Sequence, residues 1–514
     1  MSIKVSLTGA SGAIGGETLL HLLSSPLDIV PRIIVRKTSK KSSFFKKVLK
    51  LGKGKIEIVY GDIRNYEDCV RLISGADYVI HLAALIPPRS EHDAMTTYET
   101  NFNGTKNMVD AVINSGRKDE IKFVYMGTVA EYGNRSYKHP WGRVGDPIIS
   151  SNYDEYSYSK IKAERYVLDA ELPHFVSVRQ TAVAHKFLFK NNMSDGLMFQ
   201  TVLNEPFEWV TDRDSGLMLE HLVEYDFENK LDGFWNRIYN IGGGLKCRQI
   251  GFETIDDGFK LMGRGVKDFF DPNWSALRNF HGMWYLDSDE LDSYLHFRND
   301  TINDFWKRMG KKYWYFKLGR IVPKSWIRGL VFKPLLKYDD APIYYVNHHK
   351  DGYVKAFYGG YHIFYNIPKS WSDYSLLSEG KCPDGTLIDY EEFKTPEYGL
   401  KHHLYLDHGF DENKPRNELD IEDMKQAAKF RGGECLSTSM KKGDLYTKLK
   451  WRCHEGHEFM ASPYTILFGG FWCPKCAEPK PWAYGKLAKV SPFHAQIYFD
   501  DFDESEVDDI YPLK

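Results

Sequence analysis

The sequence has little of three features that would assign it to a large class of proteins. Its 514 residues include seven cysteines, too few for a small disulfide-rich secreted scaffold. No apolar run approaches the ~20 residues of a membrane-spanning helix, and no apolar leader precedes the first predicted strand. The net charge is −2, so no global field favours nucleic acid or a membrane surface. We therefore expect a cytoplasmic protein without a membrane partner.

The first fifteen residues contain the clearest motif. Residues 3–7 alternate between apolar and polar, as a strand does, and the apolar residues of 13–23 recur at helical spacing. Gly9, Gly12 and Gly15 lie between them. Such a turn suits a pyrophosphate, because glycines allow a tight turn and close backbone approach at the positive end of a helix. The alternative is a glycine turn in some other strand–helix unit.

The same alternation of short strand and helix continues through the first half of the chain. Strands are expected at 3–8, 30–36, 55–60, 77–82, 121–127, 174–180 and 237–241, and helices at 13–25, 65–74, 92–115 and 154–171. This order predicts an α/β protein with a Rossmann-type doubly wound parallel sheet. The length of the chain predicts about three domains in all.

Three short stretches add detail to the expected nucleotide site. The second strand ends at Arg36 and Lys37, where an acidic residue would suit NAD, so a basic residue favours the 2′-phosphate of NADP. The alternative is that both belong to a solvated basic segment that continues to Lys55. Asp62 and Ile63 follow the third strand and suit an adenine ring, and the small Ala83 leaves room beside the sheet.

The predicted chemistry rests on Thr128, Tyr156 and Lys160. Thr128 lies at the end of a strand, and Tyr156 and Lys160 are four residues apart on one helix face. A phenol has a pKa of about 10, and a nearby ammonium favours the phenolate, which can then exchange a proton with a substrate oxygen. Asn101 is expected to support the lysine or a water. The alternative for the YxxxK pair alone is a surface helix contact.

The ordered motifs TGASGAIG, GDI, HLAA, NFNGT, YSYSK, VSVRQ and YNIGGG resemble the extended short-chain dehydrogenase/reductase family, the NAD(P)-dependent epimerase/dehydratase group. The resemblance covers about residues 1–245 and weakens towards 310. It implies that Thr128, Tyr156 and Lys160 are catalytic, with Asn101 as an accessory. It also implies a cofactor site to which Tyr156 and Lys160 contribute, together with Gly9, Ser11, Gly12, Ala13, Ile14, Gly15, Arg36, Asp62, Ile63 and Ala83.

Departures from the family pattern narrow the expected activity. Val129 and Ala130 stand where dehydratases carry acidic residues, and Ala182 stands where sugar-nucleotide binders carry asparagine. We therefore predict an NADP(H)-dependent oxidoreductase that acts on a carbonyl or secondary alcohol. One alternative is an NAD(P)-dependent nucleotide-sugar epimerase, and another is a cofactor-binding scaffold whose metal module recognises a partner or nucleic acid. The candidate substrate contacts are Arg143, His185 and Arg213.

A second motif lies near the C-terminus. Cys453 and His457 form a short knuckle, and Cys473 and Cys476 follow in a Cys-Pro-Lys-Cys loop. This spacing suits tetrahedral zinc and resembles a zinc ribbon or treble-clef finger. With all four positions filled by protein the metal is expected to be structural. The balanced local charge favours a stabilising or protein-contact role over nucleic-acid binding.

The remaining segments carry weaker patterns. Residues 311–336 are basic and aromatic, which fits a membrane-surface helix or a nucleic-acid patch, but we favour a packed amphipathic helix. Alternating runs in 338–410 predict a small β-rich module. The acidic residues after 498 predict a solvated tail that could dock on the lysines of 37–55.

The expected boundaries follow these changes of pattern. They are a nucleotide-binding and substrate domain at 1–310, an aromatic-rich accessory region at 311–425, a zinc module at 426–480 and an acidic tail at 481–514. The sequence leaves the oligomeric state open, although the family's members often form homodimers through helices that correspond to 92–115 and 154–171.

Overall fold

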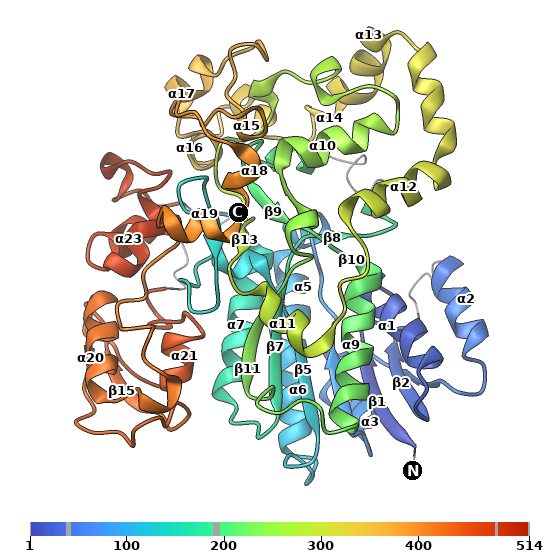
Figure 1. The fold of residues 1–514 in the computed structure, drawn as a ribbon, viewed down its shortest axis with the longest axis vertical. Coiled ribbons are helices and arrows are strands. Elements are labelled where there is room, and N and C mark those ends of the chain that lie inside the picture. The colour runs from blue at the N-terminus through green and yellow to red at the C-terminus, as the bar shows by residue number, and fades with distance from the viewer. Residues whose placement is uncertain (1, 38–42, 189–195, 478–481, 512–514) are drawn as a thin grey trace.

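The computed structural model describes residues 2–37, 43–188, 196–477 and 482–511. Its centre is a parallel sheet of seven strands in the order β11-β7-β5-β4-β1-β2-β3 (Figure 1). The strands are β1 (Ile3–Thr8), β2 (Ile29–Val35), β3 (Glu57–Tyr60), β4 (Tyr78–His81), β5 (Lys122–Thr128), β7 (Phe175–Gln180) and β11 (Arg237–Ile241). The predicted Rossmann-type fold and all seven predicted strands are confirmed.

Helices cover both faces of this sheet, as its apolar strands require. The helices α1 (Ala13–Ser24) and α9 (Asp212–Phe227) share one buried cluster with β1, and α3 (Tyr66–Ile73), α6 (Gly104–Ile113) and α7 (Glu155–Asp169) share another with β5. In the register of β5 with β7, Thr128 pairs with Gln180 at the carboxyl edge. Ligands of such sheets bind at this edge.

Three pairs of short strands and a run of helices build a second layer above the carboxyl edge (Figure 1). They include β9 (Pro206–Glu208) with β12 (Arg248–Ile250), and β6 (Trp141–Gly142) with β13 (Trp284–Tyr285). The helices α10 (Gly251–Lys260), α12 (Ile302–Lys312) and α16 (Asp351–Tyr358) belong to this layer. It corresponds to the predicted substrate subdomain, extended by residues well beyond 310.

The prediction of a β-rich module at 338–410 is wrong. All residues from 311 to 425 are described, and they form helices and turns without a strand. The run YVKAFYGGYHIFYNI folds as α16 and α17 (Tyr361–Asn366), separated by Gly359 at φ 85° and Gly360 at φ 117°. Val354, Phe357 and Tyr358 are buried at helical spacing, so the aromatic residues that favour strands pack here from one helix face.

The prediction that the basic aromatic segment packs into the protein is also wrong for most of its length. Neither η7 (Trp314–Ile321) nor α13 (Lys324–Ile327) contains a buried residue. Only Phe332 and Leu335 near its end enter a buried cluster. No helix among the described residues has the length and apolar character needed to cross a membrane.

The predicted solvated tail is folded. The helices α22 (Tyr484–Ala488) and α23 (Pro492–Tyr498) pack into a cluster with Tyr345 and Phe357. Asp500 accepts hydrogen bonds from Ser136 and His139, and Glu506 pairs with Arg278 at 2.5 Å. The tail therefore lies against residues 134–139 and 278 rather than against the lysines of 37–55, of which residues 38–42 lie outside the described residues.

The C-terminal module consists of α20 (Ile421–Phe430), the strands β14 (Glu434–Cys435), β15 (Leu449–Arg452) and β16 (Glu458–Ala461), and α21 (Pro463–Leu467). Trp451, Ile466 and Trp472 belong to the same buried cluster as Val112 and Ile161 of the sheet's helices. Arg165 of α7 donates to the Trp472 carbonyl at 3.2 Å. The module is thus packed against the nucleotide-binding fold.

Candidate active site and metal cluster

The glycine turn has the form that a bound pyrophosphate needs. Gly9 adopts φ 71°, and the Gly12 N–H donates to its carbonyl at 2.9 Å just before α1 begins. A Cβ on Gly9 would lie 2.8 Å from the Leu82 carbonyl carbon, and one on Gly15 would overlap the Gly9 carbonyl. No side chain fits in this cradle, so the backbone at the N-terminus of α1 stays open to an anion.

The other predicted nucleotide contacts surround this turn. Ala83 donates its N–H to Thr8 Oγ1 at 3.0 Å, which holds the end of β4 beside the turn. Ile63 is buried, and Arg36 is exposed directly after β2. Asp62 accepts two hydrogen bonds from the Arg64 guanidinium, at 2.9 and 3.2 Å. Partial burial raises the pKa of the Asp62 carboxyl, but Arg64 and then Arg36 outweigh this and lower it.

Arg36 is available to an added phosphate. It makes no hydrogen bond or ion pair with any described residue, although its charge acts on Asp62. The residues present therefore fit a nicotinamide dinucleotide, with the glycine turn for its pyrophosphate and Arg36 for a 2′-phosphate. Ser11, Ala13 and Ile14 lie on the turn and the first helical residues, where the resemblance placed them.

The three predicted catalytic residues come together at the carboxyl edge of the sheet. Thr128 ends β5, and its hydroxyl lies near enough to Tyr156, at the start of α7, to affect the pKa of the phenol. Asp154 caps α7 by accepting the Ser157 N–H at 2.8 Å, and Ser157 Oγ donates to the Ala130 carbonyl at 2.6 Å. These contacts fix the helix against the segment that follows Thr128. Burial raises the pKa of the Tyr156 phenol, and the hydrogen bond from Thr128 opposes this.

Lys160 lies one turn after Tyr156 on the same helix and is 4% exposed. Its ammonium donates to the Met126 carbonyl at 2.7 Å and lies 4.1 Å above the Tyr125 ring. Burial lowers the pKa of Lys160 to about 8, against the opposing effect of Glu131 and Glu164. The lysine is therefore largely protonated at neutral pH, as a group that favours the neighbouring phenolate must be.

Asn101 does not contact Lys160. Its amide donates to the Leu85 carbonyl and to Ser159 Oγ, both at 3.0 Å, and its oxygen accepts the Leu85 N–H at 2.7 Å. Asn101 thus ties the loop after β4 to the helix that carries Tyr156 and Lys160.

A buried network that the sequence did not predict supports the same site. Glu131 Oε1 accepts the Thr128 N–H at 3.0 Å, and Arg179 pairs with Glu164 at 2.7 Å. Burial, followed by the charge of Glu164, holds the pKa of Glu131 well above its usual range. Burial raises the pKa of Glu164 as well, but Arg179 outweighs this and lowers it. The pKa values of the two carboxyls are therefore shifted in opposite directions.

A cavity of about 840 Å³ opens beside Thr128. Its wall is mainly apolar and includes the rings of Phe207, Trp209, Phe259, Phe280, Trp306, Tyr345, Tyr353 and Phe357. Its charged lining residues are the acids Glu91, Asp154, Asp339 and Asp340 and a single lysine, Lys350. No arginine appears among the described residues that line it. No local pattern predicts that residues 339–357 line this wall, because they reach it only through the tertiary fold.

None of the three predicted substrate contacts lines this cavity. Arg143 pairs with Glu412 at 2.6 Å and lies 4.9 Å from the Tyr405 ring, so it anchors the C-terminal part of the chain. His185 follows β7 outside the lining, and burial lowers its pKa to about 4. Arg213 is more than half exposed and lies 3.8 Å from Asp300.

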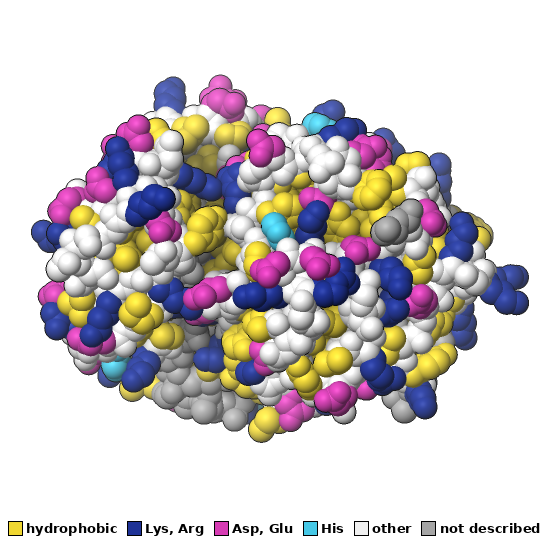
Figure 2. All heavy atoms as spheres, turned by 90° about the horizontal axis from the view of Figure 1, so that it is seen from below, with side chains coloured by type: hydrophobic (Ala, Val, Ile, Leu, Met, Phe, Trp, Pro, Cys, Tyr) yellow, Lys and Arg dark blue, Asp and Glu magenta, His cyan; other side chains and the backbone are white. Residues whose placement is uncertain are grey.

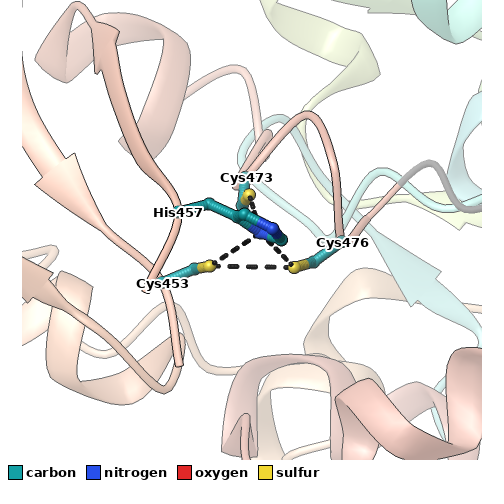
Figure 3. A group of neighbouring side chains, drawn as sticks. All are labelled: Cys453, His457, Cys473 and Cys476. Atoms are coloured by element: carbon teal, nitrogen blue, oxygen red, sulfur yellow. Dashed lines mark hydrogen bonds between the residues drawn. The ribbon is translucent and has the colours of Figure 1, made fainter. Parts of the chain in front are cut away.

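The four predicted metal ligands form one cluster (Figure 3). Their ligand atoms all lie within 4.8 Å of one another. His457 Nδ1 is 3.4 Å from Cys453 Sγ and 3.3 Å from Cys476 Sγ, and the two sulfurs are 3.7 Å apart. A zinc ion with Zn–S bonds of about 2.3 Å requires ligand separations of about 3.8 Å. Cys473 completes the set, and Cys435 is not part of it.

Comparison with known proteins agrees with the order of elements in the first part of the chain. Residues 5–193 match the model of the NAD dependent epimerase/dehydratase family, which is less than half of the chain. The dinucleotide-binding class of fold thus has support from both the sheet and the sequence. The individual proteins that resemble this chain match only part of it.

Among curated proteins, 3 beta-hydroxysteroid dehydrogenase type 7 of Mus musculus is 27% identical over 167 residues, 32% of this chain and 43% of that protein. UDP-glucose 4-epimerase of Rickettsia akari (strain Hartford) is 33% identical over 112 residues, 21% of this chain and 32% of that protein. The chain thus spans less than half the length of these relatives.

Among solved structures, dTDP-glucose 4,6-dehydratase from Bacillus anthracis str. Ames has a TM-score of 0.47 at 17% identity, covering 62% of this chain and 98% of that one. The DesIV double mutant, a dTDP-glucose 4,6-dehydratase from Streptomyces venezuelae, has a TM-score of 0.49 at 20% identity and covers 65% and 100%. Both likenesses are too weak to carry a functional argument.

Proposed function

We propose that the protein is a nicotinamide-dependent oxidoreductase that acts on an apolar carbonyl or secondary alcohol. The observation that carries this proposal is the position of Thr128, which lines the cavity at the end of β5 and acts on the phenol of Tyr156, with Lys160 one helical turn further on. A substrate oxygen in the cavity near Thr128 would thus lie near the phenol.

The residues of the site have distinct roles in this proposal. A bound nicotinamide supplies or accepts the hydride. Tyr156 passes a proton to the substrate oxygen in reduction and removes it in oxidation. Thr128 holds the same oxygen by a hydrogen bond, and the charge of Lys160 favours the phenolate form of Tyr156. Asn101 and Glu131 hold the helix and the strand end in place.

The lining of the cavity supports an apolar substrate. Its aromatic and aliphatic wall favours burial of apolar surface, each Å² of which contributes about 25 cal/mol. A diphosphate in the same space would face four carboxylates and only Lys350 as a counter-charge. This charge pattern is the reason for preferring a neutral carbonyl compound to a sugar nucleotide.

We also propose NADP(H) as the preferred cofactor. Arg36 is exposed, lies at the end of the second strand and has no hydrogen-bond or ion-pair partner among the described residues. An unpaired guanidinium at this place suits the 2′-phosphate that distinguishes NADP from NAD.

A nucleotide-sugar epimerase is the second candidate. The similarity to UDP-glucose 4-epimerase of Rickettsia akari favours it, because the matched residues are 33% identical, compared with 27% for the 3 beta-hydroxysteroid dehydrogenase. An epimerase uses the same Thr128, Tyr156 and Lys160 for a transient oxidation and retains its cofactor.

One experiment separates these candidates. The purified protein is incubated with NADPH or NADH and either a panel of apolar ketones or UDP-sugars, and cofactor absorbance and sugar products are followed. The oxidoreductase consumes NADPH with a ketone. An epimerase converts the sugar without net consumption, and a scaffold binds cofactor but turns over neither, with binding that survives Tyr156→Phe.

For the C-terminal module we propose a structural zinc ion held by Cys453, His457, Cys473 and Cys476. The four ligand atoms are as close together as a tetrahedral zinc ion requires. Four protein ligands leave no coordination position open for a substrate, which supports a structural role. The loop that carries Cys473 also contacts α7 through Arg165, so the metal would stabilise the packing of the module on the nucleotide-binding fold.

A further inference from the structure

The segment of residues 311–338 carries the densest group of exposed apolar side chains on the described part of the molecule. Eight of the twenty-five large apolar side chains that are exposed there fall in it. Ile321 is 82% exposed, Leu330 75%, Trp314 66% and Trp326 63%. Figure 1 shows α13 (Lys324–Ile327), which belongs to this segment, at the top edge of the molecule. Exposed apolar patches of this kind mark interaction surfaces.

The segment is also uniformly basic. It contains eight lysines and arginines and no acidic residue. Lys324 and Arg328 pair with Asp268 and Asp271 at its base. Five others make no ion pair with a described residue, namely Lys311, Lys317, Arg320, Lys333 and Lys337. By contrast, the opposite end of the molecule mixes basic and acidic side chains (Figure 2).

The exposed arrangement is held in place by the fold. Arg264 donates to the carbonyls of Arg320 and Val322, at 3.0 and 3.2 Å. Phe332 and Leu335 are buried in the cluster below. The backbone is therefore fixed from inside, while Trp314, Ile321 and Trp326 remain more than 60% exposed.

The chemistry of the segment selects among the partners that could cover it. A second copy of the same surface would bring two sets of eight positive charges together, which is unfavourable. Single-stranded nucleic acid would match the charge, but its bases stack on aromatic rings and offer nothing to Leu318, Ile321 and Leu330. A bilayer with anionic headgroups suits both the positive charge and the exposed apolar side chains of the segment. Aliphatic side chains enter the acyl boundary, and tryptophans lie at headgroup level.

We propose that residues 311–338 dock the protein on the surface of an anionic lipid bilayer. Trp306, just before the segment, and Asp339 and Asp340, just after it, line the cavity beside Thr128. Docking therefore brings the wall of the cavity close to the lipid surface. The inference does not depend on the proposed reaction, because it rests on exposure and charge alone.

The test uses the full chain and sedimentation with vesicles of phosphatidylcholine, with or without phosphatidylserine. We expect binding to the mixed vesicles that weakens with added salt and is far weaker on phosphatidylcholine alone. The charge variant is Lys317→Glu with Lys333→Glu, and the apolar variant is Ile321→Ser with Leu330→Ser. Each basic residue at an anionic surface strengthens binding about fivefold, so each double variant should bind at least about tenfold more weakly.

Matched controls carry the same changes elsewhere. Lys441→Glu with Lys442→Glu gives the same change of net charge, and Leu387→Ser with Leu400→Ser removes two exposed leucines outside the segment. Both controls should bind vesicles as the unchanged protein does. The proposal is overturned if the controls lose as much binding as the segment variants. It is equally overturned if the protein binds a single-stranded oligonucleotide through these residues and no vesicle.

Discussion

The rings of Tyr153 and Tyr353 stack face to face, with centroids 4.0 Å apart and planes 8° apart. Tyr153 precedes the helix that carries Tyr156, and Tyr353 belongs to α16, two hundred residues further along the chain. Both line the cavity beside Thr128. The stack joins the segment just before α7 to the accessory region, so residues beyond the family match take part in shaping the cavity.

Replacing Tyr353 by alanine should weaken substrate binding more than chemistry. Stacked rings contribute about 0.5–1.5 kcal/mol beyond their buried area, so we expect KM for an apolar ketone to rise up to about tenfold with a smaller change in kcat. Steady-state kinetics measure both. Tyr365→Ala on α17, whose ring is 68% exposed, is the control and should leave KM unchanged. A fall in kcat at constant KM would contradict the assignment of this wall to the substrate.

Tyr156→Phe should abolish most of the turnover while NADPH binding persists. Loss of a positioned acid–base group lowers the rate about 10²–10⁴-fold. Tyr158→Phe, two residues along the same helix with its ring stacked on Tyr98, is the matched control. Stopped-flow absorbance gives the rate and fluorescence titration gives the binding. Full activity in Tyr156→Phe would contradict the proposed acid–base role of Tyr156.

Arg36→Ala should reduce the preference for NADP(H). A charge-assisted hydrogen bond contributes about 1.5–3 kcal/mol, so KM for NADPH should rise about 10–100-fold while that for NADH stays the same. The exposed Lys53→Ala variant in the same basic segment controls for loss of charge. An equal loss with both cofactors would place the 2′-phosphate elsewhere.

Cys473→Ser should lose the bound metal and much of the stability of the C-terminal module. Atomic absorption on the unchanged protein is expected to give one zinc per chain, and thermal unfolding should show a lower Tm for the variant. Cys435→Ser, in the same module but outside the cluster, should keep both. Freshly prepared protein without zinc would refute the assignment.

Asp287 should make the free energy of unfolding depend on pH in the mildly acidic range. Burial raises the pKa of this carboxyl to about 6, despite hydrogen bonds from Val144 and Asn240. A raised pKa means that the folded state holds the proton more tightly, so the stabilisation is present below pH ~4 and is lost as pH rises through about 6. From pH 5 to 8 this removes about 1–2 kcal/mol.

Asp287→Asn should therefore flatten the pH dependence of the free energy of unfolding, measured by urea titration at several pH values. The exposed Asp28→Asn variant controls for the loss of one charge. An unchanged slope in Asp287→Asn would show that this carboxyl is not the source of the dependence.

The first half of the fold was predictable because its signals are local. Alternation in residues 3–7 and helical spacing in 13–23 each depend on neighbours in sequence, and the four metal ligands lie within 24 residues of one another. Tyr156 and Lys160 likewise share one helix. Patterns of this length are fixed by backbone geometry rather than by distant contacts.

The second half was not predictable in the same way. The aromatic residues of 353–365 favour strands by intrinsic preference, but their packing against Tyr153 and the tail selects helices. The acidic residues after 498 have the pattern of a solvated tail, yet Arg278 lies across the fold to pair with Glu506, and His139 to bond Asp500. The cavity wall at 339–357 depends wholly on such long-range contacts.

The long path of the chain to that wall also determines when the site can form during synthesis. The sheet and the turn that suits a dinucleotide are complete once β11 has left the ribosome, whereas Tyr345, Tyr353 and Phe357 follow about a hundred residues later, and their buried cluster closes only with Tyr498 and Phe502. Domains fold in the order of their synthesis. A nascent chain can therefore hold a folded nucleotide-binding sheet beside an open pocket, and the wall of that pocket is supported only once Tyr498 and Phe502 have been made.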